Sequence, residues 1–453
     1  MRDKGARRKN VLWKDCKKEE AKRMNSNRGH RWALCAFLSA FVFAFILFPA
    51  IPVSAHIPFY AHSNQAESTH QFALQIYGNA NEDDTIDMRD VTYIKLVIFG
   101  KKPETALCDA NYDGRVSMLD VVQTKLIIVG KEGKLTIVDS ANRIVTLKKP
   151  IDRVVAADLL NGIRTLLKLD AEEKLVAIND YAVTYGFGPK SCFPLSLIAP
   201  ELEELPSVGS YDSPDMEMIL SLEPDLVLAY GGDVADMIQE STGIPTIYLD
   251  TSEALDFKWF RLAGYIMDEE ERVEELISYA NEEITKITEV TSDIPDDEKR
   301  TVYLAFWTFM GDITYTPAEY APVEFAGGIN VAKEGVPGPF GPIMLEVSKE
   351  QIIEWDPEII LLHGTYITRE EVLSDPALQT VTAVKNGDVY YTPGYCLGWD
   401  PVTGVAETVY MAALFYPDKF SDLDVEEECN EIFKEFYGVD GLWTWIVEHV
   451  LTP

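Results

Sequence analysis

Cysteine is scarce in this chain: 453 residues contain six, and no two are spaced as a CxxC pair. Zinc knuckles and thiol redox motifs are therefore excluded. Two of the cysteines, Cys16 and Cys35, fall in the N-terminal leader. An exported protein can form a disulfide, and the sequence leaves its pairing open among four residues: Cys108, Cys192, Cys396 and Cys429.

Histidine is equally scarce, with six in the chain and only His363 and His449 in the main body. A carrier of bare zinc or manganese needs several imidazoles at one site, so that class is excluded. The chain also lacks GxSxG, Walker A, HExxH and GxGxxG patterns in a strand–turn–helix setting. These absences argue against an enzyme, and no catalytic residue is predicted.

Positive charge is in short supply, because 40 Lys and Arg face 74 Asp and Glu, for a net charge of −34. Residues 1–32 hold 12 of the basic side chains and only four acidic ones, so the rest of the chain is more acidic still. Phosphate backbones would repel such a body, which excludes nucleic-acid binding. The acidic side chains also supply oxygen ligands for hard cations.

Only one long apolar run is present, Trp32–Val53, and Ser54-Ala55 completes a small-residue cleavage pattern after it. Residues 1–55 are therefore a signal peptide or an N-terminal membrane anchor, since about 20 apolar residues can span a bilayer. Translation from Met24 instead of Met1 would give a leader of ordinary length. Every alternative places the body outside the cytoplasm, at the cell surface or secreted.

A repeat comes after the leader. Residues 79–90 (NANEDDTIDMRD) and 109–120 (DANYDGRVSMLD) match at an offset of 30, and the match continues into two apolar helices, expected at Val91–Phe99 and Val121–Val129. Oxygen ligands at loop positions 1, 3, 5, 7, 9 and 12 can wrap one calcium ion. The predicted ligands, with position 7 acting through its carbonyl, are Asn79, Asn81, Asp83, Thr85, Asp87 and Asp90, then Asp109, Asn111, Asp113, Arg115, Ser117 and Asp120.

The first of the two sites is predicted to be the weaker, because Asp84 stands where Gly114 gives the second loop its sharp turn. The paired loops, each closed by Asp instead of Glu and followed by one helix, resemble a type I dockerin module over residues 72–131. The resemblance implies two structural calcium ions and a cohesin partner on another protein. A calcium-stabilised spacer without a partner is the alternative.

Beyond residue 134 strand and helix patterns alternate, which predicts parallel sheets with helices on both faces. A hairpin is expected at Lys134–Leu147, and one long helix at Glu269–Ile294, where apolar residues recur at helical spacing up to Pro295. The expected strands are Val154–Ala157, Leu175–Ile178, Leu226–Tyr230, Thr246–Leu249, Val302–Phe306, Ile359–His363 and Val389–Thr392.

A second internal echo lies within this body. The segment Glu217–Leu228, with Pro224, parallels Glu350–Leu361, with Pro357, at an offset of 133. Each copy reads as a short amphipathic helix, a proline break and a buried strand. The fold class predicted is therefore α/β, with two Rossmann-like lobes (about 150–250 and 300–453) bridged by the long helix (about 269–294), preceded by the small all-α calcium-loop domain.

Four runs in this body resemble the periplasmic binding proteins for ferric siderophores, haem and cobalamin: Pro206–Tyr211, Ala326–Val331, Ser348–Ile352 and Ala383–Tyr390, in that order. The resemblance covers about residues 135–420 and implies a solute-binding subunit of an ABC importer. It also implies that one acidic residue on each lobe docks on the permease, by position Glu217 and Glu350. Alternatively both glutamates only begin helices, where negative charge is favourable.

Ligands of such a fold lie between the lobes, at the carboxyl ends of the strands. Aromatic residues dominate there and cations are few, which favours an iron chelate or a corrinoid such as cobalamin. His363 is either an axial metal ligand or a polar rim residue. The predicted ligand-binding residues are Asn161, Tyr181, Tyr185, Tyr211, Asp212, Tyr230, Trp307, His363, Tyr366, Tyr395 and Trp399. The alternative function is a cell-surface enzyme or structural component docked to a cohesin.

Overall fold

The computed structural model describes residues 73–451, apart from 189–190, 192, 251–254, 256, 307, 333–334, 339–340, 365 and 394–399. The predicted leader, 1–55, lies outside the described residues. None of the helices described is long and apolar enough to cross a membrane. Cys108 and Cys429 are buried free thiols, so neither forms a disulfide, while Cys192 and Cys396 are not among the described residues.

Helices α2 (Met88–Ile98) and α3 (Met118–Ile128) come directly after the two repeated loops, as the repeat predicted. Each begins with a capping box, in which the residue at loop position 9 caps the helix and the aspartate at position 12 accepts from the cap backbone. Ala80, Val91, Ile94, Cys108 and Val121 form a small core between the helices. We call residues 73–131 the loop module.

The loop module is packed against the β-hairpin that comes next in the chain. Strands β1 (Lys134–Val138) and β2 (Ile144–Lys148) form the predicted antiparallel hairpin, and Ile76 bridges to Ile137 on its free edge. Leu74, Ile76 and Ile127 are buried in one continuous core with the hairpin and the body. The domain predicted at residues 72–131 stays a prediction; several of its residues share a hydrophobic core with the hairpin and the body.

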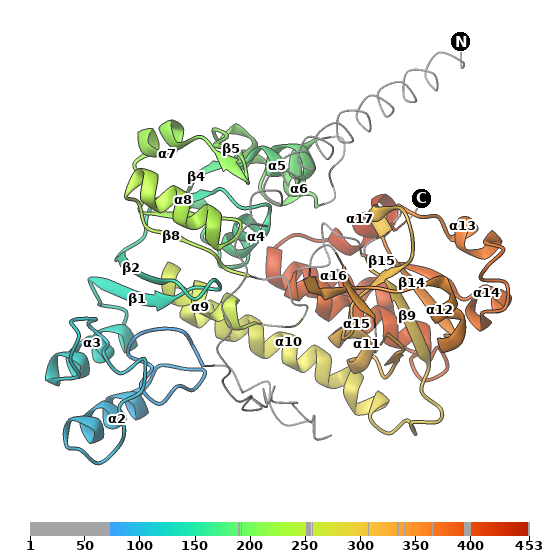
Figure 1. Ribbon diagram of the computed structural model, residues 1–453, viewed down its shortest axis with the longest axis horizontal. Helices are drawn as coiled ribbons and strands as arrows, with labels where there is room; N and C mark the ends of the chain where they lie inside the picture. Colours follow the sequence, from blue (N-terminus) through green and yellow to red (C-terminus); the bar gives the residue numbers. More distant parts are fainter. Residues whose placement is uncertain are drawn as a thin grey trace, which may run out of the picture. The chain divides into compact units, whose positions relative to one another are not determined.

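The first lobe, drawn mainly in green in Figure 1, is built on a four-stranded parallel sheet of order β4-β3-β7-β8. Its strands are β3 (Val154–Ala156), β4 (Leu175–Ile178), β7 (Leu226–Leu228) and β8 (Thr246–Ile247), with a small β5–β6 hairpin (Gly209–Ser210, Ser213–Pro214) beside it. The helical segments are α4 (Asn161–Lys168), η1 (Glu172–Lys174), α5 (Asp180–Ala182), η2 (Val183–Phe187), α6 (Leu195–Ile198), η3 (Pro200–Glu204), α7 (Met216–Leu222) and α8 (Gly232–Thr242).

Helix α9 (Lys258–Met267) and the long helix α10 (Glu270–Thr291) connect the lobes along the chain. The prediction of one long helix at 269–294 is confirmed to within a few residues. Its stripe of apolar residues is buried, because Val273, Leu276, Ala280 and Ile287 are spaced by three, four and seven residues and so lie on one face.

The second lobe has its own parallel sheet, of order β11-β9-β14-β15. Its strands are β9 (Thr301–Ala305), β11 (Ile329–Asn330), β14 (Ile359–His363) and β15 (Val389–Thr392). The helical segments are η4 (Thr308–Met310), α11 (Ala321–Phe325), α12 (Lys349–Trp355), α13 (Arg369–Ser374), α14 (Thr382–Asn386), α15 (Pro401–Phe415), α16 (Val425–Tyr437) and α17 (Leu442–His449). A three-stranded antiparallel sheet, β10 (Tyr315–Thr316), β13 (Gly341–Glu346) and β12 (Val336–Gly338), was not predicted.

Both parallel sheets have the same topology. Numbered by their place in the chain, the strands of each run 2-1-3-4, and the echoed segment supplies strand 3 in both, as β7 and β14. Helices α7 and α12 precede these strands and end alike, with Glu223 (φ 47) and Asp356 (φ 44) in the left-handed region just before a proline. The repeated sequence segment therefore has the same structure in both copies, which confirms two similar α/β lobes.

Candidate functional site

Four predicted tyrosines of the first lobe form a continuous row of rings, which we call the tyrosine row. The Tyr181 and Tyr185 ring centroids lie 4.3 Å apart, and Tyr181 meets Tyr211 edge-on at 6.2 Å. Tyr211 in turn meets Tyr230 edge-on at 5.0 Å. Separations of this size are those at which aromatic pairs attract one another. Residues from three separate segments are thus brought together, as the sequence predicted.

The ends of the parallel strands position this row. Asn179 follows β4, caps α5 by accepting from the backbone N–H of Tyr181, and donates through Nδ2 to the Leu159 carbonyl at the end of β3. Tyr230 follows β7, and Gly231 (φ 92) then turns the chain into α8. The row therefore lies at the carboxyl edge of the sheet, where ligands of open α/β folds bind.

The second lobe contributes Tyr366, which follows β14 and lies edge-on to Phe309 with ring centroids 6.1 Å apart. Tyr366 is 58% exposed; desolvation of its phenol raises its pKa, and the Tyr185 phenol raises it further. Tyr185 belongs to the first lobe, so this electrostatic interaction acts between phenols of the two lobes. The predicted site residues Trp307, Tyr395 and Trp399 lie outside the described residues.

His363 is not on the rim of a cleft, contrary to one of the two expectations for it. It is 1% exposed, its ring stacks on Phe306 at 4.0 Å, and its Nδ1 lies 2.6 Å from the Phe306 carbonyl oxygen. Burial lowers its pKa to about 3, so the imidazole is neutral. Nε2 is buried without a hydrogen-bond partner among the described residues, and its metal-ligand role stays a prediction.

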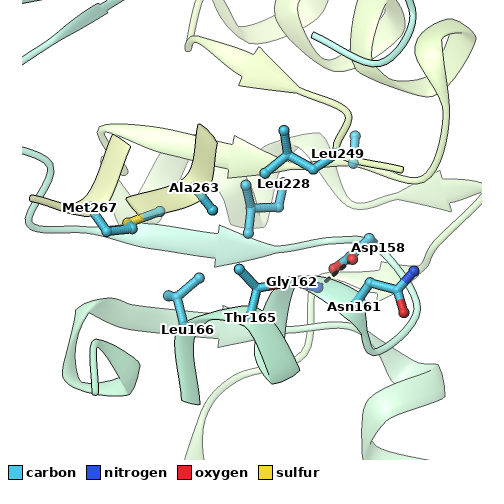
Figure 2. Close-up of a pocket in the computed structure, with 10 residues that line it drawn as sticks. Asp158, Asn161, Gly162, Thr165, Leu166, Leu228, Leu249, Ala263 and Met267 are labelled. Atoms are coloured by element: carbon cyan, nitrogen blue, oxygen red, sulfur yellow. Dashed lines mark hydrogen bonds between the residues drawn. The ribbon is translucent and has the colours of Figure 1, made fainter. Parts of the chain in front are cut away.

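Asn161 lines a small cavity in the first lobe (Figure 2). The cavity holds about 10 Å³, which is room for one water molecule and not for a chelate. Asp158 also lines it; its Oδ2 accepts from the Gly162 N–H at 2.6 Å, while Oδ1 is buried without a partner among the described residues. Burial raises the pKa of Asp158 to about 6.

Asp212 is exposed in the turn between β5 and β6. Its carboxylate accepts from the Ser210 hydroxyl at 2.5 Å and from the Ser213 hydroxyl at 3.2 Å, so the side chain is engaged by its own turn. Arg369 is the first residue of α13 in the second lobe. Its guanidinium donates to the carbonyls of Val389 and Gly387, which gives it a structural role in the second lobe.

Sequence reasoning missed a buried charge network behind the site. Lys168 on α4 pairs with Asp400 at 2.6 Å, with both side chains at most 3% exposed, and the Tyr437 hydroxyl donates to the same carboxylate. Burial alone would raise the pKa of Asp400, but the charges of Lys168 and Arg164 hold it below its usual range. Arg164 and Lys168 stand four residues apart on a helix that also carries Ile163, Leu166 and Leu167, a spacing that could have marked a shared buried face.

The two predicted docking glutamates occupy equivalent places. Glu217 lies in the first turn of α7 and Glu350 in the first turn of α12, and both are exposed. Asp215 and Ser348 cap these helices with their side-chain oxygens, so neither glutamate is needed as a cap. Their docking role stays a prediction, and its geometry is that of two matched acidic points, one per lobe.

The residues of the two loops fit a calcium ion in part. In each loop the aspartate at position 12 accepts from the backbone N–H groups of positions 3 and 9, which closes the loop on itself. Asn79 Oδ1 and Asn111 Oδ1 are buried acceptors with no partner among the described residues. In the described chain no three acidic, histidine or cysteine side chains converge as a metal cluster. Both calcium sites therefore remain predictions.

Comparisons with known proteins identify the fold family. The family model described as periplasmic binding protein matches residues 155–396. The molybdate-binding protein MolA of Haemophilus influenzae is 24% identical over 332 residues, which cover 66% of this chain and 90% of MolA. The Fe(3+)-citrate-binding protein YfmC of Bacillus subtilis is 28% identical over 195 residues, covering 41% of this chain and 58% of YfmC.

Solved structures agree with this fold. MolA bound to molybdate matches with a TM-score of 0.54 and 21% identity over 67% of this chain and 98% of that one. Helicobacter pylori CeuE with Ni(II) bound matches with a TM-score of 0.54 and 17% identity over 68% of this chain and 99% of that one. The matched family is one of substrate-binding proteins. The chain belongs to the periplasmic binding protein family and is the solute-binding protein of an ABC importer.

Proposed function

We propose that this protein captures a metal chelate outside the cytoplasm, an iron chelate or a corrinoid of the cobalamin type, and delivers it to its permease. The tyrosine row, with ring centroids 4.3 to 6.2 Å apart, is the observation that carries the proposal. Rings of this kind cover a bulky ligand with apolar area and present hydroxyl groups to its polar edge.

The charge of the row favours a ligand that is close to neutral. Burial raises the pKa of Tyr230, and the neighbouring Tyr211 phenol and Asp250 carboxylate raise it further. The Tyr230 phenol is therefore protonated at neutral pH and offers a hydrogen bond without charge. A strongly anionic catecholate would instead require several arginines; Arg369 of the second lobe donates to backbone carbonyls of its own lobe.

Relatives support a metal-bearing ligand as a class. Their names specify molybdate for MolA, ferric citrate for YfmC and petrobactin for YclQ of Bacillus subtilis. Molybdate is the second candidate, because the match to MolA extends over 90% of that protein. It is a compact oxyanion, so it would bind by charge-assisted hydrogen bonds and depend little on aromatic area.

A binding panel with row variants separates these candidates. Ferric chelates, haem, cobalamin and molybdate are offered in turn to the purified exported protein, and binding is followed by absorbance and calorimetry. Tyr211→Ala is expected to weaken a bulky chelate roughly tenfold, because stacked aromatic area is lost. Tyr112→Ala, on the loop module, serves as the control with unchanged affinity. Molybdate binding that is indifferent to Tyr211→Ala would replace the chelate proposal.

Delivery to the permease runs through Glu217 and Glu350, which present one acidic side chain on each lobe for basic residues of the transporter. Reversing both charges with Glu217→Lys and Glu350→Lys is expected to abolish uptake while ligand affinity is unchanged. Glu354→Lys is the matched control, since Glu354 is exposed on the same helix as Glu350. Full uptake by the double variant would leave the two glutamates as helix-starting residues only.

The loop module serves, in this proposal, as a calcium-dependent attachment point for a cohesin-bearing protein. Exposed apolar side chains on α3 support a docking role, with Met118 at 54%, Leu119 at 60% and Val122 at 52% exposure. Because the module shares a core with the β1–β2 hairpin, it has to be tested within the whole exported protein. Calcium-dependent capture by purified cohesin domains is expected, and capture that persists in excess chelator would contradict it. A spacer or another cell-surface role is the outcome if no cohesin binds.

A further inference from the structure

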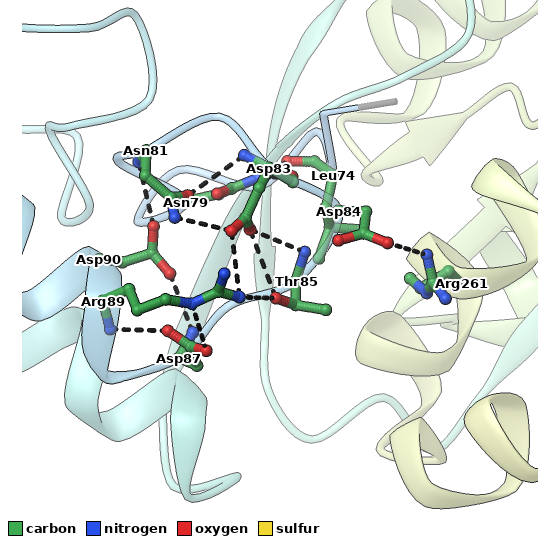
Figure 3. A network of polar contacts seen from close by, with 10 residues as sticks. All are labelled: Leu74, Asn79, Asn81, Asp83, Asp84, Thr85, Asp87, Arg89, Asp90 and Arg261. Atoms are coloured by element: carbon green, nitrogen blue, oxygen red, sulfur yellow. Dashed lines mark hydrogen bonds and ion pairs between the residues drawn. The ribbon is translucent and has the colours of Figure 1, made fainter. Parts of the chain in front are cut away.

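The first loop already holds positive charge on three of its oxygen-bearing side chains (Figure 3). Arg89, at loop position 11, pairs through Nε with Asp87 at 2.8 Å and through Nη2 with Asp83 at 3.1 Å. The same Nη2 donates to the Thr85 hydroxyl at 3.0 Å. These partners stand at loop positions 5, 7 and 9. One guanidinium therefore occupies the side chains that a bound cation would contact.

A second guanidinium arrives from the body. Arg261 on α9 pairs with Asp84, at loop position 6, across 3.2 Å. Arg261 is 8% exposed and is held by two contacts to Glu274 on α10, at 2.5 and 2.9 Å. The loop is thereby tied to both helices that connect the lobes, by a largely buried ion pair of fixed geometry.

The second loop has neither feature. Leu119 replaces the arginine at position 11, and Gly114 replaces the aspartate at position 6. Among the described residues no lysine or arginine forms an ion pair with Asp109, Asp113 or Asp120, the three aspartates of this loop. Their oxygens accept from backbone and amide N–H groups only, which leaves their negative charge uncompensated.

The backbones of the loops differ at the same point. Both loops take a left-handed residue at position 4, Glu82 (φ 56) and Tyr112 (φ 54). Only the second loop takes another at position 6, Gly114 (φ 88), because Asp84 is not in the left-handed region. A glycine turn at position 6 is what folds a calcium loop tightly around its ion. The first loop therefore lacks both the free charge and the turn.

We infer that Arg89 is a built-in cation of the first loop, that this loop holds the module on the body without a metal, and that a divalent cation of the calcium class binds at the second loop alone. The inference rests on the calcium role proposed for the module and restricts it to one ion per chain. A calcium ion at the first loop would have to displace Arg89 from three oxygens while remaining close to its charge.

Aspartates at the same position of the two loops provide a matched test in the whole exported protein. Calcium stoichiometry is measured by calorimetry and native mass spectrometry after treatment with chelator. The wild type is expected to bind one ion. Asp113→Ala, at position 5 of the second loop, is expected to lower the affinity roughly tenfold or more because a ligand charge is lost. Asp83→Ala, at position 5 of the first loop, is expected to leave affinity and stoichiometry unchanged.

Exchanging position 11 tests the role of the guanidinium itself. Leu119→Arg is expected to weaken calcium binding at the second loop, whereas Arg89→Leu is expected to lower the melting temperature in chelator without changing calcium affinity there. Circular dichroism confirms that each variant folds. Two ions per wild-type chain, or loss of the ion in Asp83→Ala, would overturn this inference and leave the calcium role standing. No bound calcium at all would overturn the calcium role as well.

Discussion

The two lobes share a strand order, yet their interiors are stabilised differently. Strand 3 of each sheet, β7 or β14, is fully buried, and a buried carboxylic acid without an ion-pair partner among the described residues lies near each sheet, Asp158 in the first lobe and Glu407 in the second. In the first lobe Asp158 accepts a single backbone N–H and borders a small cavity. In the second lobe Glu407 is fully buried and accepts from the hydroxyls of Tyr320 and Thr392. The common topology is thus set by apolar strands, whereas the polar core of each lobe is its own.

The largest effect is expected where the lobes are joined. Lys168→Met removes the charge that faces Asp400 and leaves a buried carboxylate with an incomplete set of partners. Breaking such a pair costs about 3–5 kcal/mol of unfolding free energy. Urea unfolding is expected to show this loss, and to separate into two steps when each lobe is followed by its own fluorescence probe.

Lys174→Met is the matched control for that prediction. Lys174 donates to the carbonyls of Ile151 and Met267 and pairs with no carboxylate across the lobes among the described residues. Its replacement is expected to cost about 1 kcal/mol, the typical value of a hydrogen bond, and to keep unfolding in one step. Adding Asp400→Asn to Lys168→Met should restore part of the loss; equal stability of wild type and Lys168→Met would mean that the pair does not clamp the lobes.

The two buried acids are expected to make stability fall as pH rises. Burial raises the pKa of Glu407 to about 7 and that of Asp158 to about 6, above their ordinary values of 4.5 and 3.8. The folded state therefore binds these protons more tightly, and the stability that they contribute is lost as pH rises through the folded-state pKa. Between about pH 5 and pH 8 the loss is about 2–3 kcal/mol for Glu407 and about 1–2 kcal/mol for Asp158.

Replacing each buried acid by its amide measures how much that acid contributes to the pH dependence of stability. Glu407→Gln is expected to flatten the pH dependence of the unfolding free energy more than Asp158→Asn does, because the second lobe's acid has the larger shift. The double variant should be flatter than either. If Asp158→Asn had the greater effect, the order of burial assigned to the two acids would be reversed.

Elements that have a local sequence pattern were predicted, whereas contacts between residues far apart in the chain were not. The strand at Ile359–His363 and the helix at 269–294 follow from local patterns of apolar residues, and the tyrosine row follows from where parallel strands end. The pair Lys168–Asp400 joins positions 232 residues apart, so no local pattern reveals it. Strand β12, Val336–Gly338, contains proline and glycine, which oppose a strand by propensity and pair only in tertiary context.

The core that the loop module shares with the body was not predicted, for a similar physical reason. Ile76 and Ile86 lie in or beside the first loop and read as ordinary loop residues, yet both are buried in the core of the body. Burial of this kind depends on the hairpin and on α9, which lie far along the chain. A repeat in sequence thus predicted the local fold of the module without predicting how it is attached.

The smallest effect is expected at the residues that end the echoed helices. Glu223 and Asp356 are both left-handed, which costs a non-glycine residue roughly 1 kcal/mol that glycine would relieve. Asp356 also accepts from the Thr382 N–H at 2.7 Å and the Thr382 hydroxyl at 3.0 Å. Glu223→Gly is therefore expected to raise the melting temperature slightly, while Asp356→Gly lowers it because two hydrogen bonds are lost. Shifts of the same sign at both sites would show that backbone strain alone governs these helix ends, and that the lobes are more alike in energy than their polar contacts indicate.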